Sequence, residues 1–157
     1  MIPTPVIIIL AVILFVGFFI LIFHQLAKKL KTQEQTVREK FKDKLVYRSS
    51  AGANFAGQKS KGMAQIRGNG ALVLVEDQLY FEMLMPKREI IIPIEKITNV
   101  TKVNAFLAKA KGMPLLMVEF LNNEGQADAA AWWVRNVDEW IKSINELRDK
   151  RDEKNEN

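Results

Sequence analysis

The sequence predicts an N-terminal transmembrane helix followed by a small β-barrel or β-sandwich of about seven strands, which a C-terminal amphipathic helix caps. Three observations lead to this fold class. Residues 6–23 form an unbroken apolar run, short apolar runs separated by turn sequences follow from Met63 onward, and residues 137–147 carry apolar side chains at helical spacing. The length of 157 residues suits one small domain with attachments.

The apolar run at residues 6–23 predicts an uncleaved membrane anchor. Sixteen of its eighteen residues are Val, Ile, Leu or Phe, and eighteen helical residues reach about 27 Å, close to the thickness of a hydrocarbon core. On an insertion scale these side chains contribute about −6 kcal/mol. A cleaved signal peptide fits less well, because no Lys or Arg precedes the run and no A-x-A-like site follows it. We therefore assign residues 1–24 to a single-pass anchor.

The basic charge lies beside this anchor. Residues 1–62 contain ten Lys or Arg and three Asp or Glu, whereas residues 63–157 contain thirteen and fifteen. The positive-inside rule then places the N-terminus outside and the C-terminal domain in the cytoplasm. The same charge predicts that anionic lipid lies near the stalk. A nucleic-acid partner is not expected, because the folded domain lacks the net positive charge that such a partner requires.

Residues 25–62 are predicted to be a basic stalk and a flexible linker. A thin apolar stripe at spacings of four and seven runs through the stalk, which suits a short coiled coil, a helix lying on lipid headgroups, or a solvated continuation of the anchor helix: Leu26, Leu30, Val37, Phe41 and Leu45. Residues 49–62 are rich in Gly, Ala and Ser and are expected to be flexible.

The folded domain is expected to span residues 63–150. Its predicted strands are residues 64–67, 72–75, 79–85, 89–93, 97–103, 115–121 and 127–134. Turns are predicted at residues 68–70, 76–78, 86–88 and 122–125, and a ten-residue loop at residues 104–113.

A closing helix is predicted after Asn136, which suits an N-cap with Glu139 three residues later. Its apolar stripe should cap the open end of the barrel and place three side chains in the core: Trp140, Ile141 and Ile144. Residues 151–157 are expected to form a disordered tail.

The sequence contains little catalytic chemistry. It has no cysteine and one histidine, His24, so neither a thiolate nor a multi-histidine metal site is expected. Gly68 and Gly70 lack the third glycine of a dinucleotide fingerprint and precede a strand rather than a helix. We expect no catalytic residues, no metal and no cofactor, and therefore not an enzyme.

The pattern of residues 63–150 resembles the pleckstrin-homology-like superfold, including its GRAM-type members, and small membrane-anchored bacterial proteins of unassigned role. The resemblance is carried by four segments: GNGALVLVEDQLYF, PKREIIIPIEKITNV, PLLMVEF and AWWVRNVDEWIKSI. It implies seven strands and a capping helix. In relatives that bind phosphoinositides, the ligand loops correspond to residues 68–70, 86–88 and 122–126. Only Lys87 and Arg88 are basic there, which departs from the basic cluster of a headgroup site.

Two functions follow as hypotheses. The first is a membrane-anchored interaction module that binds or scaffolds a protein partner of unknown identity at the cytoplasmic membrane face. The second is a peripheral reader of anionic lipid headgroups. The candidate residues for lipid or partner binding are Lys87, Arg88, Phe106, Leu107, Lys109 and Lys111. Phe106 and Leu107 could instead fold under the predicted loop as a satellite core. The integral anchor makes lipid recruitment redundant and favours the first function.

Overall fold

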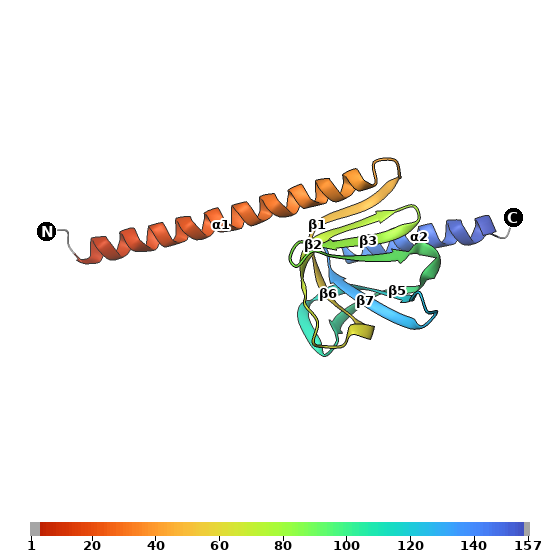
Figure 1. The fold of residues 1–157 in the computed structure, drawn as a ribbon. Coiled ribbons are helices and arrows are strands. Elements are labelled where there is room, and N and C mark those ends of the chain that lie inside the picture. The colour runs from red at the N-terminus through yellow and green to blue at the C-terminus, as the bar shows by residue number, and fades with distance from the viewer. Residues whose placement is uncertain (1–3, 156–157) are drawn as a thin grey trace.

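The computed structural model describes residues 4–155 and consists of a long helix, one curled antiparallel sheet and a second helix (Figure 1). Helix α1 spans Thr4–Lys40 and helix α2 spans Val137–Asn155. The seven strands are β1 (Val46–Gln58), β2 (Gly68–Val75), β3 (Gln78–Met83), β4 (Arg88–Pro93), β5 (Ile97–Phe106), β6 (Lys109–Leu121) and β7 (Ala127–Trp133). Short 3₁₀ turns, η1 (Lys59–Lys61) and η2 (Ile94–Lys96), follow β1 and β4.

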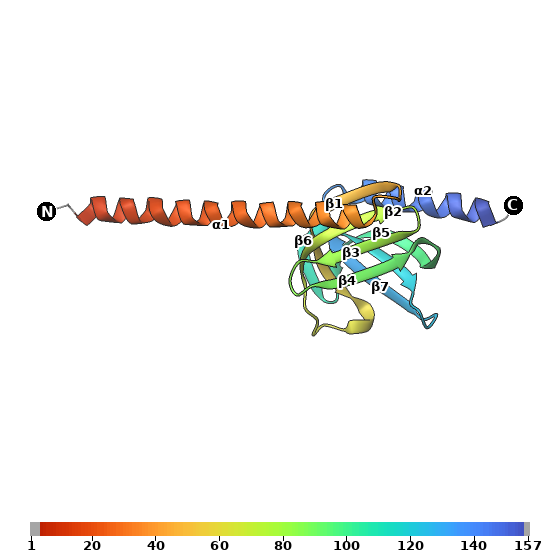
Figure 2. The same cartoon turned by 45° about the horizontal axis from the view of Figure 1, so that its top comes forward.

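Helix α1 is long and apolar enough to cross a membrane, and none of its apolar window is buried inside the protein. The helix continues without a break from this apolar half into the polar stalk, and Figures 1 and 2 show the stalk lying across the sheet. Val37 and Phe41 are buried there against Ala71, Val73 and Tyr80. The stalk therefore has a packing partner within its own chain, which none of the three interpretations of its apolar stripe anticipated.

The expectation of a flexible linker at residues 49–62 is wrong, because residues 46–58 form β1, the central strand of the sheet. The strand order is β4-β3-β2-β1-β7-β6-β5, so β1 pairs with β2 on one side and with β7 on the other. Its inward-facing Phe55 is fully buried and stacks near Phe81 and Trp132. The small residues that indicated flexibility instead allow close packing, since Gly52 lies beside Leu30 of α1.

The structure contains seven strands, as predicted, but the first strand is not the predicted one. Residues 64–67 are not a strand, and the predicted turn at residues 68–70 lies within β2. Gly70 has a steric reason for its lack of a side chain, because a Cβ at this position would lie 2.1 Å from the carbonyl oxygen of Glu82 on β3. The glycines therefore bring two strands together rather than turning the chain.

The main core lies on the concave face of the sheet, and α2 closes it. Trp140 and Ile144 of α2 are buried in this core, and Ile141 packs against its edge. Helix α2 continues to Asn155, so residues 151–155 are helical rather than a disordered tail. Arg151 contributes to this extension through an ion pair of 2.8 Å to Glu95.

Candidate functional site

A polar network fastens the end of α1 to the outer face of β3 and β4. The ammonium group of Lys40 donates hydrogen bonds to Tyr80 Oη (2.9 Å), to Glu89 Oε1 (3.0 Å) and to Glu82 Oε2. Tyr80 also donates to Glu82 Oε2 over 3.0 Å. About two turns closer to the apolar half, Gln33 Nε2 donates to the Glu82 carbonyl oxygen over 2.9 Å. These bonds fix the rotation of α1 on the sheet.

The titration behaviour of this network follows from burial and pairing. Burial raises the pKa of Tyr80, and the neighbouring carboxylates add to this rise while Lys40 opposes it. The hydrogen bonds from Tyr80 and Lys40 lower the pKa of Glu89. The Glu82 carboxylate therefore lies between a cation and a protonated phenol. Its negative charge is compensated inside the protein, which suits a structural clasp.

Lys87 and Arg88 do not form a joint basic site. Lys87 is 71% exposed in the turn between β3 and β4, and its Nζ lies 3.9 Å from Glu82 Oε1. Arg88 turns the other way, with its guanidinium 5.7 Å from the ring centre of Phe55 and its Nη2 donating to Gln58 Oε1 over 3.4 Å. Lys87 and Arg88 thus contact different residues and do not point to a common ligand position.

The predicted loop at residues 104–113 is mostly a β-hairpin, with β5 and β6 joined by a tight turn at Leu107 and Ala108. Both turn residues have positive φ angles, of 50° and 58°. Phe106 is buried and Leu107 packs beside it, on the side of the sheet opposite the main core. The satellite-core alternative for these two residues is therefore what the structure contains. Lys109 and Lys111 belong to β6, but their side chains lie outside the described residues.

A buried acid holds the far end of β1 in place. The Asp128 carboxylate accepts hydrogen bonds from Gln58 Nε2 and Ser60 Oγ, both at 2.6 Å, and from the Ser60 amide at 2.9 Å. Burial works to raise the pKa of Asp128, but these bonds outweigh burial and lower it. These bonds connect β7 to the end of β1 and the turn after it, so Asp128 is a structural anchor there.

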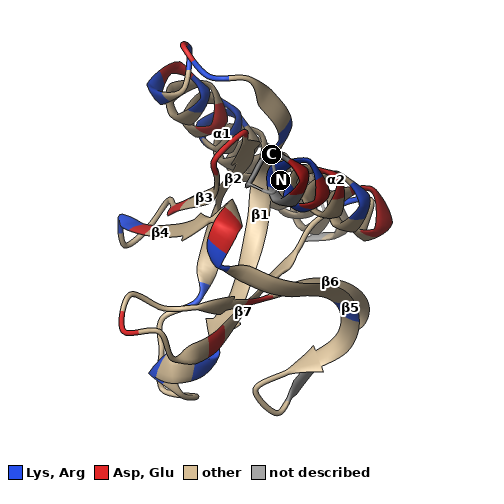
Figure 3. Ribbon diagram, turned by 90° about the vertical axis from the view of Figure 1, so that its right-hand side faces the viewer, with Lys and Arg blue, Asp and Glu red and all other residues tan. Residues whose placement is uncertain are grey.

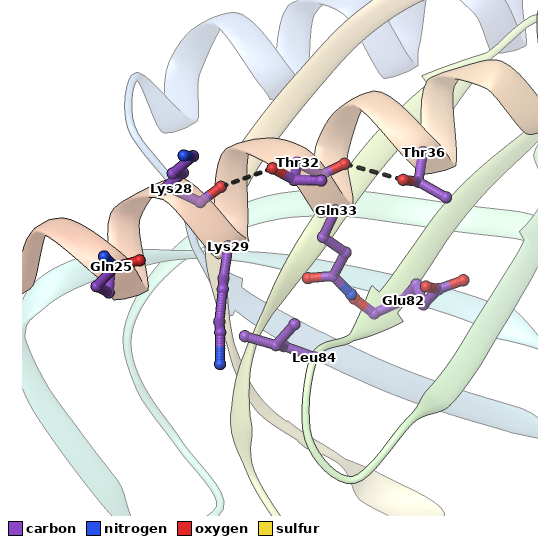
Figure 4. A pocket seen from close by; sticks show the side chains of 8 residues that line it. All are labelled: Gln25, Lys28, Lys29, Thr32, Gln33, Thr36, Glu82 and Leu84. Carbon is purple, nitrogen blue, oxygen red and sulfur yellow. Dashed lines mark hydrogen bonds between the residues drawn. The ribbon is translucent and has the colours of Figure 1, made fainter. Parts of the chain in front are cut away.

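Two grooves flank the stalk where it meets the domain. The first, of about 450 Å³, lies between α1 and the end of β3. Figure 4 shows its lining: Lys29 extends toward Leu84, Gln33 extends toward Glu82, and Lys28 points to the other side of the helix. The second, of about 570 Å³, lies between α1, the start of β1 and the turn before α2, and Lys31, Arg135 and Trp133 contribute to it. Both contain basic side chains next to the apolar half of α1.

A third feature is the free edge of the sheet at β4. Within residues 4–155, β4 pairs with β3 alone, and Ile91 in its centre is 52% exposed. A groove of about 210 Å³ runs beside this edge toward the turn between β6 and β7, where Asn122 and Asn123 lie. At the opposite edge, β5 packs against α2. The β4 edge is therefore the open one.

The described residues contain no group of three His, Cys, Asp or Glu side chains that could hold a metal ion. Figure 3 shows charged residues concentrated on the two helices and in turns, with the strands mostly uncharged. The candidate interaction features among the described residues are grooves and a sheet edge. The sequence could not pair Lys29 with Leu84, because 55 positions separate them along the chain. The run Ile90-Ile91-Ile92 is a weak signal for the β4 edge. Alternation of apolar and polar residues along a half-buried strand explains Ile90 and Ile92 but not the apolar Ile91 between them.

Comparisons with known proteins provide fold information only. No family model matches the sequence, and no curated protein matches it. One similar solved structure is the C-terminal domain of an unknown protein from Leishmania infantum, with 12% sequence identity and a TM-score of 0.51. The alignment covers 73% of this chain and 96% of that domain. The two proteins share a curled antiparallel sheet fold.

Proposed function

We propose that this protein is a non-enzymatic, membrane-anchored interaction module with a pleckstrin-homology-like domain, which binds a protein partner along its β4 edge at the cytoplasmic membrane face. The fold assignment is supported by the strand order, in which two antiparallel meanders meet at β1, and by the C-terminal helix that closes the concave face. Anchoring is supported by the apolar half of α1. Cytoplasmic orientation is supported by the eight Lys and Arg residues between positions 24 and 48.

The observation that carries this proposal is the exposed centre of an unpaired edge strand. Free backbone N–H and C=O groups on such an edge are a template for an added strand. Ile91 lies beside Tyr80 on the outer face and offers an apolar contact for alternate side chains of that strand. The groove beside β4 has room for the side chains that face the other way. An extended segment with a β-branched or aromatic residue opposite Ile91 matches this surface.

The test is site-specific photocrosslinking in intact cells. A photoreactive amino acid replaces Ile91 in the full-length protein, and a matched variant carries it at Leu45, which is 60% exposed in the turn after α1. The expected result is a discrete adduct with one protein from position 91 and none from position 45. A second probe at Asn123, in the groove beside β4, should give the same adduct, and adding Ile91→Asp should abolish it. Equal labelling from positions 91 and 45 would contradict the proposal.

The alternative function, reading of lipid headgroups through Lys87, Arg88, Lys109 and Lys111, has less support. Arg88 is directed toward Phe55 and Gln58, and Lys87 lies near the buried Glu82. Phe106 is buried rather than presented at a loop tip. This set therefore offers one freely exposed cation among its described side chains.

A further inference from the structure

We infer that the first groove beside α1, lined by Lys29, Gln33 and Leu84, is a binding site for the headgroup of an anionic phospholipid from the membrane that α1 enters. The inference goes beyond partner binding at β4 and shares with it only the proposed anchor. It depends on three features of the groove: its position along α1, its charge, and its apolar wall.

The position follows from the continuity of α1. The same straight helix contains the apolar run, which ends at Phe23, and the groove residues Gln25, Lys29 and Thr32. At about 1.5 Å per residue, Gln25 lies about 3 Å and Lys29 about 9 Å beyond Phe23. The headgroup layer on each side of a bilayer is about 5–8 Å thick. Gln25 therefore lies within the headgroup layer and Lys29 at its outer boundary, and the groove extends from there toward the domain.

The charge of the groove suits a phosphate. Lys29 makes no ion pair within residues 4–155. The one acidic residue in the lining, Glu82, is compensated by Lys40 and Tyr80 and is almost fully buried. An entering phosphate thus meets the Lys29 ammonium group and no free carboxylate. A basic residue near an anionic leaflet contributes about 1 kcal/mol to binding.

The apolar wall suits the carbon atoms of a lipid headgroup. Leu84 lines the groove, and the adjacent Met85 is 81% exposed in the turn between β3 and β4. Figure 4 shows the aliphatic chain of Lys29 running toward Leu84, with its ammonium group at the end. A phospholipid whose phosphate contacts Lys29 can therefore place the carbon atoms of its headgroup against Leu84. A free phosphate ion would use the cation but not the wall.

The experiment measures lipid retention by native mass spectrometry on the full-length protein, released from a neutral detergent. Phosphatidylglycerol and phosphatidylcholine with identical acyl chains are supplied in competition. We expect preferential retention of phosphatidylglycerol. Lys29→Gln should weaken its apparent affinity about fivefold, which corresponds to about 1 kcal/mol. Lys31→Gln is the matched control, because it removes the same charge from the same helix on the side of the second groove.

A second variant distinguishes a groove from diffuse attraction. Thr32 is exposed and lines the groove, so Thr32→Trp should fill it and reduce retention without changing the charge. Equal retention of the two lipids would overturn the inference. The inference would also be overturned if Lys29→Gln and Lys31→Gln reduced lipid retention equally, or if Thr32→Trp left retention unchanged. Displacement of the lipid by inorganic phosphate or glycerol phosphate would assign the groove to a soluble phosphate instead. Loss of the Ile91 adduct would leave these results unaffected, so the two proposals fail separately.

Discussion

The central place of β1 predicts that the domain cannot fold from residue 63 onward. We compare three fragments: residues 25–157, which keep the stalk and β1; residues 43–157, which keep β1 without the stalk; and residues 63–157, which lack both. Fragment 25–157 should fold, because it contains every packed element outside the apolar half of α1.

The magnitudes follow from what each deletion exposes. Removing the stalk exposes the surface that Val37 and Phe41 cover. It should lower the free energy of unfolding by about 3–6 kcal/mol, at about 1.5–3 kcal/mol for each buried side chain. Removing β1 also deletes Phe55, whose buried surface of about 150–250 Å² contributes about 4–6 kcal/mol. It further leaves β2 and β7 without their shared partner. Because domains of this size are stable by about 5–15 kcal/mol, fragment 43–157 should be weakened and fragment 63–157 unfolded.

The assay is urea unfolding followed by circular dichroism, with a two-dimensional amide NMR spectrum of each fragment. The midpoint should fall from fragment 25–157 to fragment 43–157, and fragment 63–157 should give collapsed amide dispersion and no cooperative transition. A cooperative transition in fragment 63–157 with the stability of the longest fragment would refute the central role of β1. That result would support the predicted self-contained domain at residues 63–150, preceded by a flexible linker.

Three further predictions concern fragment 25–157. Trp140→Ala should lower the free energy of unfolding by about 3–5 kcal/mol, whereas the exposed Lys142→Ala should change it by less than about 0.5 kcal/mol; equal losses would show that α2 does not close the core. Gly70→Ala should cost about 3 kcal/mol, because the new Cβ meets the Glu82 carbonyl oxygen; an unchanged melting temperature would contradict that close approach. The lowered pKa of Asp128 stabilises the fold above the ordinary aspartate pKa of about 3.9, and this stability is lost as pH falls through the lowered value. The Asp128→Asn variant should therefore be less stable than the unaltered protein at neutral pH, and its stability should fall less steeply below about pH 5. Parallel stability profiles of the two proteins against pH would contradict this prediction.

The sequence predicted those elements whose own residues contain a strong periodic signal. The apolar run of α1, the strands from β2 to β7 in outline, and the stripe of α2 all follow from local spacing. The segment that became β1 has the composition of a linker, since it contains Gly52 and Gly57 among Ala and Ser. These residues are small because other elements pack closely against them. A Cβ at Gly57 would lie 2.9 Å from Leu107 Cδ1 at the tip of the β5–β6 hairpin.

The hairpin turn was hidden for a related reason. Leu107 and Ala108 adopt positive φ angles that usually indicate Gly or Asn, so no turn residue identified the position. Gly112, within the segment predicted to be a loop, lies inside β6. The buried side of Leu107 explains the exception, because its packing with Phe106 holds the turn in a conformation that local preference disfavours. Tertiary contacts overrode the local signal here.

The proposed interaction surfaces depend on a property that no local pattern contains, namely the fixed position of α1 relative to the sheet. The clasp between Lys40 and Glu82 lies seventeen residues beyond Phe23, which is about 25 Å along the helix axis. With residues 6–23 in the bilayer, as proposed, this distance sets the height of Glu89 and hence of the β4 edge above the membrane. A flexible linker would have let the domain search for its partner. A continuous helix instead holds the first groove at the headgroups and the β4 edge at a constant height, so both surfaces can be occupied at once.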